Sequence, residues 1–120
     1  MRLTHLCVAG TVTLVVAAVT ACSNSTYGGG SGGCTPTATQ VCMINTAYSP
    51  TPLTVTHGTT VTWMNGDGFA HTVTNDAGSG ETFNTQVGAG GTFTHPFNTA
   101  GTFNYHCNIH STMHGAIVVN

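Results

Sequence analysis

Short runs in which apolar and polar residues alternate recur along the C-terminal two-thirds of the chain. Such runs cover residues 53–56, 60–65, 92–97 and 102–107; residues 41–47 and 69–74 are further short strand-like runs without strict alternation, and a continuous apolar run follows at 116–119. Thr, Val, Phe and Tyr are frequent in them, and Gly, Asn, Asp, Ser and Pro fill the segments between them. Alternation with period two and regular turns is typical of short β-strands, and no window after the N-terminal segment has a helical period. The pattern predicts an all-β protein built as a two-sheet β-sandwich.

The N-terminal segment has a different pattern. Arg2 precedes an almost wholly apolar or small stretch at 6–19, and small residues lead directly to Cys22. This arrangement predicts a signal peptide over residues 1–21, too short to be a spanning helix. A Cys directly after the small residues resembles the lipobox of bacterial lipoproteins, with cleavage before Cys22 and a lipid on its side chain. The alternative is an ordinary signal peptide cut near the same place.

The segment after Cys22 is rich in Gly and Ser. Residues 22–37 are interpreted as a flexible polar tether, and residues 38–120 as the folded domain. With a lipid on Cys22, the tether would hold the domain near a membrane and leave it free to reorient. Membrane contact is then expected through the lipid anchor alone.

Charge is nearly absent from the chain. Arg2 is the only Lys or Arg, and Asp67, Asp76 and Glu81 are the only acidic residues. Nucleic acid binding needs clustered basic side chains, so nucleic acid is excluded as a partner. A protein partner has to meet an apolar or neutral face. No two carboxylates lie close in sequence, so there is no candidate pair for general acid–base catalysis.

The five cysteines divide by position. Cys7 leaves with the signal peptide, and Cys34 and Cys42 form an even pair in an exported, oxidising setting. They are candidates for a disulfide that closes a short loop; the alternative is two unrelated thiols, with Cys42 buried in a strand. No Cys-x-x-Cys is present, which argues against a thioredoxin-like dithiol and a c-type haem.

A group of metal-binding side chains lies near the C-terminus. Cys107, His110 and Met113 follow one another at intervals of three residues, and His71 lies at the start of an upstream strand. Two imidazoles, one thiolate and a weak thioether are the donors of a blue-copper electron-transfer site. Structural zinc prefers four strong nitrogen or sulfur ligands and rarely uses Met, so copper is the better match.

Four other histidines have alternative interpretations. His106 precedes Cys107, so alternation directs it to the opposite face of the strand, toward solvent or a partner. His114 follows the Met and is a rival for the fourth ligand. His57 and His95 are expected to be solvated.

The combination of motifs resembles a small cupredoxin of the plastocyanin, pseudoazurin and amicyanin group. The matching stretches are residues 48–50, 53–55, 58–65, 71–73 and 101–107, and the resemblance covers residues 41–120. It implies a Greek-key sandwich with His71, Cys107, His110 and Met113 as ligands of one copper ion that alternates between Cu(I) and Cu(II). The short ligand loop is similar to that of amicyanin. The longer plastocyanin spacing would place the axial ligand at Gly115, which has no side chain, and this leaves Met113.

The residue after the first His ligand departs from the family pattern. Many relatives have Asn there, which bridges the two ligand loops by hydrogen bonds, whereas this chain has Thr72. Its hydroxyl is a candidate for the same bridge, next to the ligands.

We therefore expect a small exported electron carrier, periplasmic or at the cell surface and monomeric, that is not itself an enzyme. The resemblance implies that redox partners dock near His110. One alternative is a copper-binding or storage protein without an electron-transfer role. Another is the electron-entry module of a larger copper oxidase or nitrite reductase; an adhesive sandwich fits the complete ligand set poorly.

Overall fold

The computed structural model describes residues 33–120, which form nine β-strands and no helix. The strands are β1 (Gln40–Ile44), β2 (Ala47–Ser49), β3 (Leu53–Val55), β4 (Thr59–Asn65), β5 (His71–Asn75), β6 (Asn84–Val87), β7 (Thr92–Phe97), β8 (Gly101–His106) and β9 (His114–Val119). The described residues accordingly include no helix long and apolar enough to cross a membrane. The predicted signal peptide, Cys22 and most of the predicted tether lie outside the described residues.

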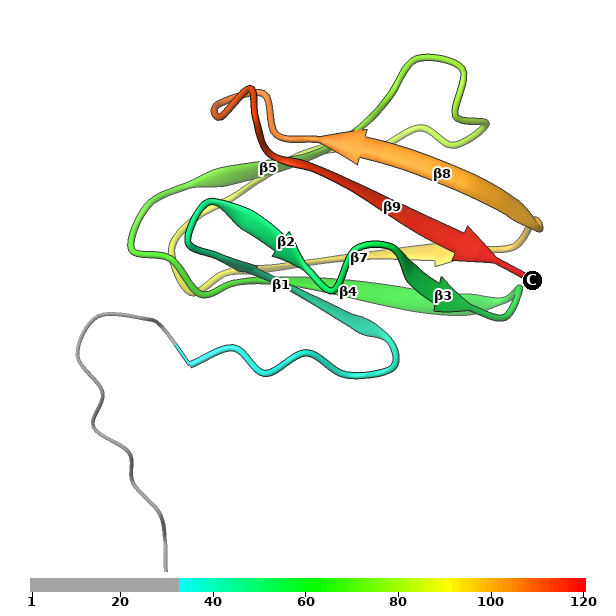
Figure 1. The fold of residues 1–120 in the computed structure, drawn as a ribbon, viewed down its shortest axis with the longest axis horizontal. Helices are drawn as coiled ribbons and strands as arrows, with labels where there is room; N and C mark the ends of the chain where they lie inside the picture. The colour runs from blue at the N-terminus through cyan, green and yellow to red at the C-terminus, as the bar shows by residue number, and fades with distance from the viewer. Residues whose placement is uncertain (1–32) are drawn as a thin grey trace, which may run out of the picture.

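Two mixed sheets pack face to face. One has the strand order β2-β1-β4-β7 and the other the order β3-β9-β8-β5-β6 (Figure 1). The pairs β1–β4 and β3–β9 are parallel, whereas all other neighbours are antiparallel. Parallel neighbours require the chain to cross between the sheets, which is how a Greek-key sandwich is built. The predicted all-β sandwich is confirmed.

The strand boundaries differ from the expectation in two places. The run at 41–47 is two strands, because Asn45 and Thr46 take left-handed φ values of 54° and 59° and turn β1 back onto β2. The strand β6 has no alternating apolar pattern, and in it only Val87 is buried. It is the edge strand of its sheet, and its other three side chains are not buried, so the sequence has no apolar alternation there.

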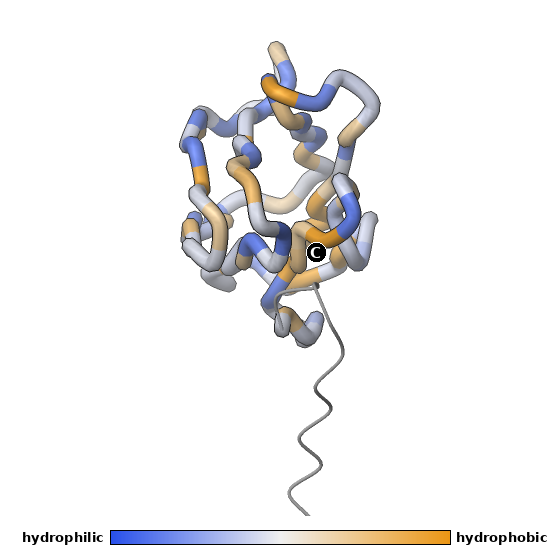
Figure 2. The backbone as a smooth tube through the Cα atoms, turned by 90° about the vertical axis from the view of Figure 1, so that its left-hand side faces the viewer, coloured by the Kyte–Doolittle hydropathy of each residue, from blue (hydrophilic) through white to orange (hydrophobic). Residues whose placement is uncertain are grey.

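The hydropathy of the chain follows the burial of the strands. In β4, Val61, Trp63 and Asn65 are buried and the residues between them are not, as expected for a strand with one face on the core. Coloured by hydropathy, the backbone shows short apolar stretches between polar or neutral ones (Figure 2).

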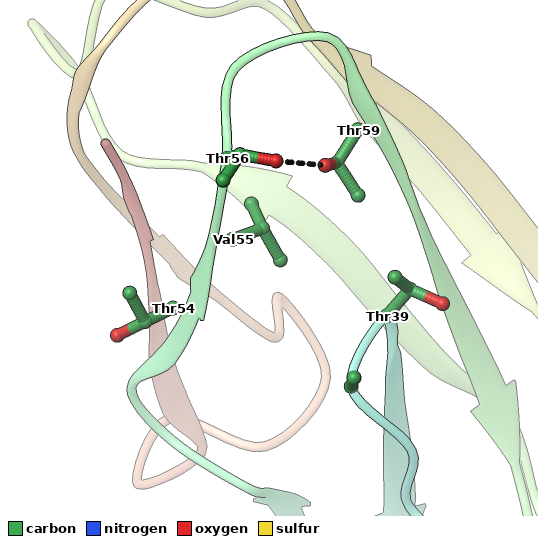
Figure 3. A pocket seen from close by; sticks show the side chains of 6 residues that line it. Thr39, Thr54, Val55, Thr56 and Thr59 are labelled. Carbon is green, nitrogen blue, oxygen red and sulfur yellow. Dashed lines mark hydrogen bonds between the residues drawn. The ribbon is translucent and has the colours of Figure 1, made fainter.

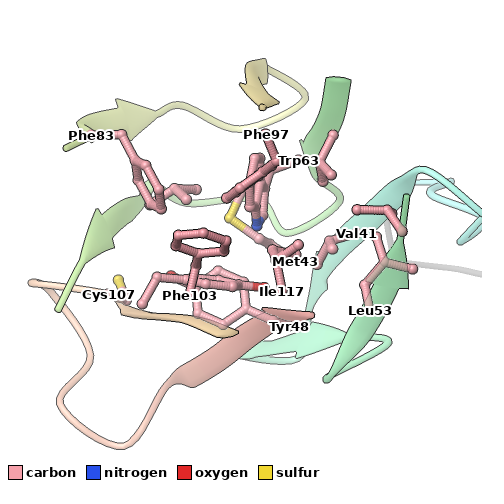
Figure 4. Packing of buried hydrophobic residues seen from close by; sticks show 14 of the residues in the cluster. Val41, Met43, Tyr48, Leu53, Trp63, Phe83, Phe97, Phe103, Cys107 and Ile117 are labelled. Atoms are coloured by element: carbon pink, nitrogen blue, oxygen red, sulfur yellow. The ribbon is translucent and has the colours of Figure 1, made fainter. Parts of the chain in front are cut away.

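Aromatic side chains from both sheets fill the space between them (Figure 4). Trp63 is fully buried, and its ring centroid lies 5.5 Å from that of Tyr105, almost perpendicular to it, and 6.3 Å from that of Phe97. Such pairs contribute about 0.5–1.5 kcal/mol each beyond the area that they bury. Because Tyr105 lies on β8, this cluster fixes the strand that leads to Cys107.

A disulfide joins Cys34 to Cys42 on β1, with their Cα atoms 5.7 Å apart. Thr37 and Gln40 also exchange backbone hydrogen bonds of 3.3 Å. The described end of the predicted tether is thus held against β1.

Gly115 lies so close to Tyr105 that no side chain fits there. A Cβ atom on Gly115 would meet the phenol ring at 2.4 Å. We expect Gly115→Ala to lower the free energy of unfolding by about 1–3 kcal/mol, because the buried ring has to move out of a packed core. Gly88→Ala is the matched control, since a Cβ there meets nothing within 4 Å. Equal stability of both variants in urea unfolding would contradict this packing.

Candidate metal centre

Two segments meet at one end of the sandwich. His71 is the first residue of β5, and Cys107 directly follows β8. These strands pair antiparallel, with Thr74 opposite His106, so β5 extends past the end of β8 and its first residues lie beside the loop that follows β8. The loop from β8 to β9 then carries His110 and Met113 at the same end.

The side-chain donor atoms of three of these residues converge. The Nδ1 atoms of His71 and His110 are 3.1 Å apart, and the Sγ atom of Cys107 lies 4.0 Å and 3.7 Å from them. An ion about 2.0 Å from each nitrogen and about 2.3 Å from the sulfur fits among donors with this spacing. Within residues 33–120, these three form the one group of His, Cys, Asp or Glu donors close enough to share an ion.

The three donors differ in their access to solvent. His71 is fully buried and Cys107 almost so, whereas His110 is partly exposed. The site is therefore closed on the side of the core and reaches the surface through one imidazole.

Met113 is also buried, with 1% of its surface exposed. Its amide donates to the carbonyl oxygen of His110, and its own carbonyl oxygen accepts from the amide of Cys107, each across 3.0 Å. These bonds fold the ligand loop back on itself and bring the backbone of Met113 beside that of Cys107.

Thr72 links the two segments. Its amide donates to the sulfur of Cys107 at 3.3 Å, and its hydroxyl oxygen accepts from the amide of Asn108 at 2.8 Å. Its carbonyl oxygen accepts the hydroxyl hydrogen of Tyr48. The Thr72 hydroxyl thus bridges the segment that begins at His71 and the loop that follows Cys107.

The environment of Cys107 favours a thiolate. Burial alone would raise the pKa of this thiol, but the Thr72 amide and the contact with His110 lower the pKa to about 6. A thiolate is the form that binds a metal.

Asp67 is a residue at the site that the sequence analysis did not identify. Its Oδ2 atom lies 2.8 Å from Nε2 of His71, the ring nitrogen that faces away from Cys107. Burial alone would raise the pKa of this carboxyl, but hydrogen bonds from the amides of Thr46 and Asn45 and from His71 lower it below its ordinary value. In the sequence, the signal for Asp67 is a carboxylate four positions before the candidate ligand His71, in a Gly- and Asn-containing segment that predicts only a turn.

The remaining histidines lie outside the donor group. Both ring nitrogens of His106 are hydrogen-bonded, to Asp76 and to Asn108, and the contact with Asp76 raises the pKa of His106. His114 is exposed and its Nε2 lies 2.9 Å from the carbonyl oxygen of Ser111.

One expectation about these histidines is wrong. His57 is exposed as expected, but His95 is only partly so. Its ring lies 4.9 Å from that of Phe83 and its Nε2 3.0 Å from a carboxylate oxygen of Glu81. The neighbouring aromatic core and the carboxylate together hold it away from solvent.

Two large apolar side chains are exposed next to the donors. Phe69 and Ile109 are 49% and 50% exposed, and the ring of Phe69 lies 5.5 Å from that of His110. No Lys or Arg occurs in residues 33–120, so the surface around His110 has no basic side chain to accompany these apolar groups.

A shallow pocket lies at the opposite end of the sandwich, where β4 begins and the C-terminus emerges (Figures 1 and 3). Its lining consists of Ala38, Thr39, Thr54, Val55, Thr56 and Thr59. It offers hydroxyl and methyl groups but no ionisable or metal-binding side chain, so the chemistry of the described domain is concentrated at the other end.

Comparisons with known proteins agree with this geometry. A family model described as copper binding proteins, plastocyanin/azurin family, matches residues 36–120. Among solved structures, a reduced amicyanin variant is 31% identical, with a TM-score of 0.63 over 68% of this chain and 80% of that one. A purple cupredoxin from Nitrosopumilus maritimus is 30% identical, with a TM-score of 0.61 over 68% of this chain and 98% of that one.

A larger enzyme contains a similar domain. The copper-containing nitrite reductase of Thermus scotoductus is 30% identical, with a TM-score of 0.65, over 72% of this chain but only 23% of that one. The comparison with curated proteins gave no match.

The fold and the converging donors define a cupredoxin. The chain belongs to the plastocyanin/azurin family of copper-binding proteins, and His71, Cys107 and His110 form its candidate copper site. It is a cupredoxin-like electron-transfer protein.

The acidity of Cys107 gives a prediction for the copper-free protein. Ultraviolet titration of the thiolate is expected to show a midpoint at a pH of about 6 instead of the ordinary 9.0. Because the pKa is lower in the folded than in the unfolded state, this group adds stability as the pH rises from 6 toward 9, and the gain is lost as the pH falls through 6. Cys107→Ser should lack the titration and that part of the pH dependence of unfolding. A midpoint near 9 would show that the amide of Thr72 does not stabilise the thiolate.

Proposed function

We propose that this protein carries single electrons between redox partners outside the cytoplasmic membrane, through one copper ion bound by His71, Cys107, His110 and Met113. The convergence of two imidazole nitrogens and a thiol sulfur within 4.8 Å of one another is the observation that supports it most directly. In such a site two imidazoles and a thiolate make the strong bonds, and a long thioether bond tunes the potential.

The surroundings of the donors suit one-electron exchange. Copper, when bound, supplies the Cu(I)/Cu(II) couple; the protein has to keep the ligands in place in both oxidation states. The amide of Cys107 donates a hydrogen bond to the carbonyl oxygen of Met113, and the amide of Thr72 donates one to the sulfur of Cys107. His71 is fully buried in the core and has no room to swing out. A site held this firmly needs little rearrangement when its charge changes.

His110 is the proposed exit for the electron. It is the partly exposed donor, and Phe69 and Ile109 beside it supply apolar surface for a partner. Exposed apolar side chains near a functional group are a common feature of docking surfaces. With no basic side chain in the domain, contact depends on shape and apolar area rather than on charge. We propose that the protein is a monomer and docks its partners through this face.

The proposed location follows from the N-terminal sequence. A signal peptide over residues 1–21, a lipid on Cys22 and the Gly/Ser-rich segment after it would tether the domain at a membrane surface, in the periplasm or on the cell exterior. In this role the protein is a carrier and not itself an enzyme.

Two other functions remain as alternatives. The resemblance to one domain of a nitrite reductase favours an electron-entry module that works within a larger assembly. A copper store is the second. Visible spectroscopy and voltammetry of the copper-loaded protein separate these two functions from the carrier. Binding of Cu(I) without a reversible voltammetric wave indicates storage. A voltammetric wave that is seen only when an enzyme is added indicates a module.

Cys107→Ser tests the proposed ligand set. The copper-loaded native protein is expected to show an intense thiolate-to-copper absorption band at about 600 nm, and the variant should lose this band entirely. No other free cysteine lies in the described residues to replace it. Since one of the relatives is a purple cupredoxin, the position of the band also reports how closely the site approaches the blue type. Retention of the band in the variant would exclude Cys107 as the ligand.

Met113→Leu tests the axial donor. Leu fills nearly the same volume as Met, so the buried position keeps its packing. The thioether, which is the proposed axial donor to copper, is lost. We expect a coloured site with a higher reduction potential by cyclic voltammetry. Met64→Leu, on the partly exposed side of β4, is the control and should leave the potential unchanged. Equal potentials in both variants would show that Met113 is not a ligand.

A further inference from the structure

The carboxylate of Asp67 joins a strained turn to the buried imidazole of His71. Asp67 lies between β4 and β5 and is almost buried. Its Oδ1 accepts the amide hydrogen of Asn45 at 2.8 Å, and its Oδ2 accepts that of Thr46 at 3.0 Å. The same Oδ2 lies 2.8 Å from Nε2 of His71. Three bonds of this kind require an acceptor at both oxygens, which a carboxylate provides and a carboxamide does not.

The turn is shaped around this carboxylate. Asn45 and Thr46 both have left-handed φ values, which are unusual for a residue other than Gly and especially for a β-branched Thr. Successive amides in such a conformation point to one side and form a small anion-binding concavity. Strain of this kind persists where the surroundings fix it, and it is concentrated at functional sites.

The bond also fixes the chemical form of His71. An ionised carboxylate only accepts hydrogen bonds, so Nε2 of His71 must carry the hydrogen. The lone pair is then on Nδ1, and this is the nitrogen 4.0 Å from Sγ of Cys107 and 3.1 Å from Nδ1 of His110. Partners of this type orient a ligand His and increase its basicity toward the metal.

We infer that Asp67 is a positioning residue of the copper site. It holds His71 with Nδ1 free for the metal, and its negative charge favours Cu(II) over Cu(I) and so lowers the reduction potential. This inference rests on the proposed role of His71 as a ligand. The competing explanation is that Asp67 only stabilises the turn between β1 and β2.

The copper-free native protein provides a first test. Long-range ¹H–¹⁵N NMR spectra of the His71 ring, recorded where the ring is neutral, should show a protonated Nε2 and an unprotonated Nδ1. The opposite tautomer would overturn the inference. This measurement needs neither a variant nor copper, so it stands even if the proposed electron-transfer role fails.

Asp67→Asn tests the effect on copper. The side-chain carboxamide of this variant can direct its oxygen toward Thr46 and His71 and lose the hydrogen bond from Asn45. The variant therefore keeps most of the side-chain contacts and loses the negative charge. We expect the affinity for Cu(II) to fall on the order of 10–100-fold, that for Cu(I) to fall less, and the reduction potential to rise. Glu81→Gln removes an equal charge from a carboxylate bonded to His95, which is not a ligand, and should leave all three values unchanged.

The two explanations give different outcomes for Asp67→Asn. The inference is overturned if Asp67→Asn lowers the free energy of unfolding but shifts the reduction potential no more than Glu81→Gln does. Asp67 would then only stabilise the turn between β1 and β2. If neither the native protein nor the variants give a reversible wave, the carrier function itself fails, and the tautomer of His71 decides the question.

Discussion

The amide of Thr72 donates a hydrogen bond to the sulfur of Cys107 across 35 residues of sequence, and the amide of Asn108 donates one to the hydroxyl oxygen of Thr72. This contact joins the start of β5 to the loop that follows β8, where the donors converge. It sets the distance between His71 and Cys107, and the amide dipole of Thr72 is one of the contacts that lower the pKa of the buried thiol. The Greek-key topology makes the contact possible, because it pairs these two strands while their connection crosses the other sheet.

The aromatic core between the two sheets holds the strands that carry the site. Trp63 and Tyr105 interlock between the sheets, and Tyr105 in turn occupies the space beside Gly115. The ligand loop between β8 and β9 therefore begins and ends on strands that cannot shift independently. A loop anchored in this way holds its donors in place without a bound ion, which is the property that an electron carrier requires of its protein.

Scarcity of charge gives the carboxylates a specific set of partners. In the described domain each carboxylate meets an imidazole: Asp67 with His71, Asp76 with His106, and Glu81 with His95. With no Lys or Arg in the described domain, histidine is the side chain that can pair with them as a cation. The consequence is a surface with little net electrostatic character, on which the exposed Phe69 and Ile109 beside His110 stand out as apolar groups.

The sequence by itself determined the class of fold and the candidate donors of the metal site. Alternation with period two is a local property, and the spacing of Cys107, His110 and Met113 in one loop is local as well, so both are legible without coordinates. The tertiary structure decided what depends on distant neighbours. The left-handed turn at Asn45 and Thr46 divides a run that the sequence predicts as one strand. The turn is held because the carboxylate of Asp67, on another loop, accepts hydrogen bonds from both amides. The partial burial of His95 and the bond between Asp67 and His71 likewise come from packing between segments, and no pattern along a single strand contains that information.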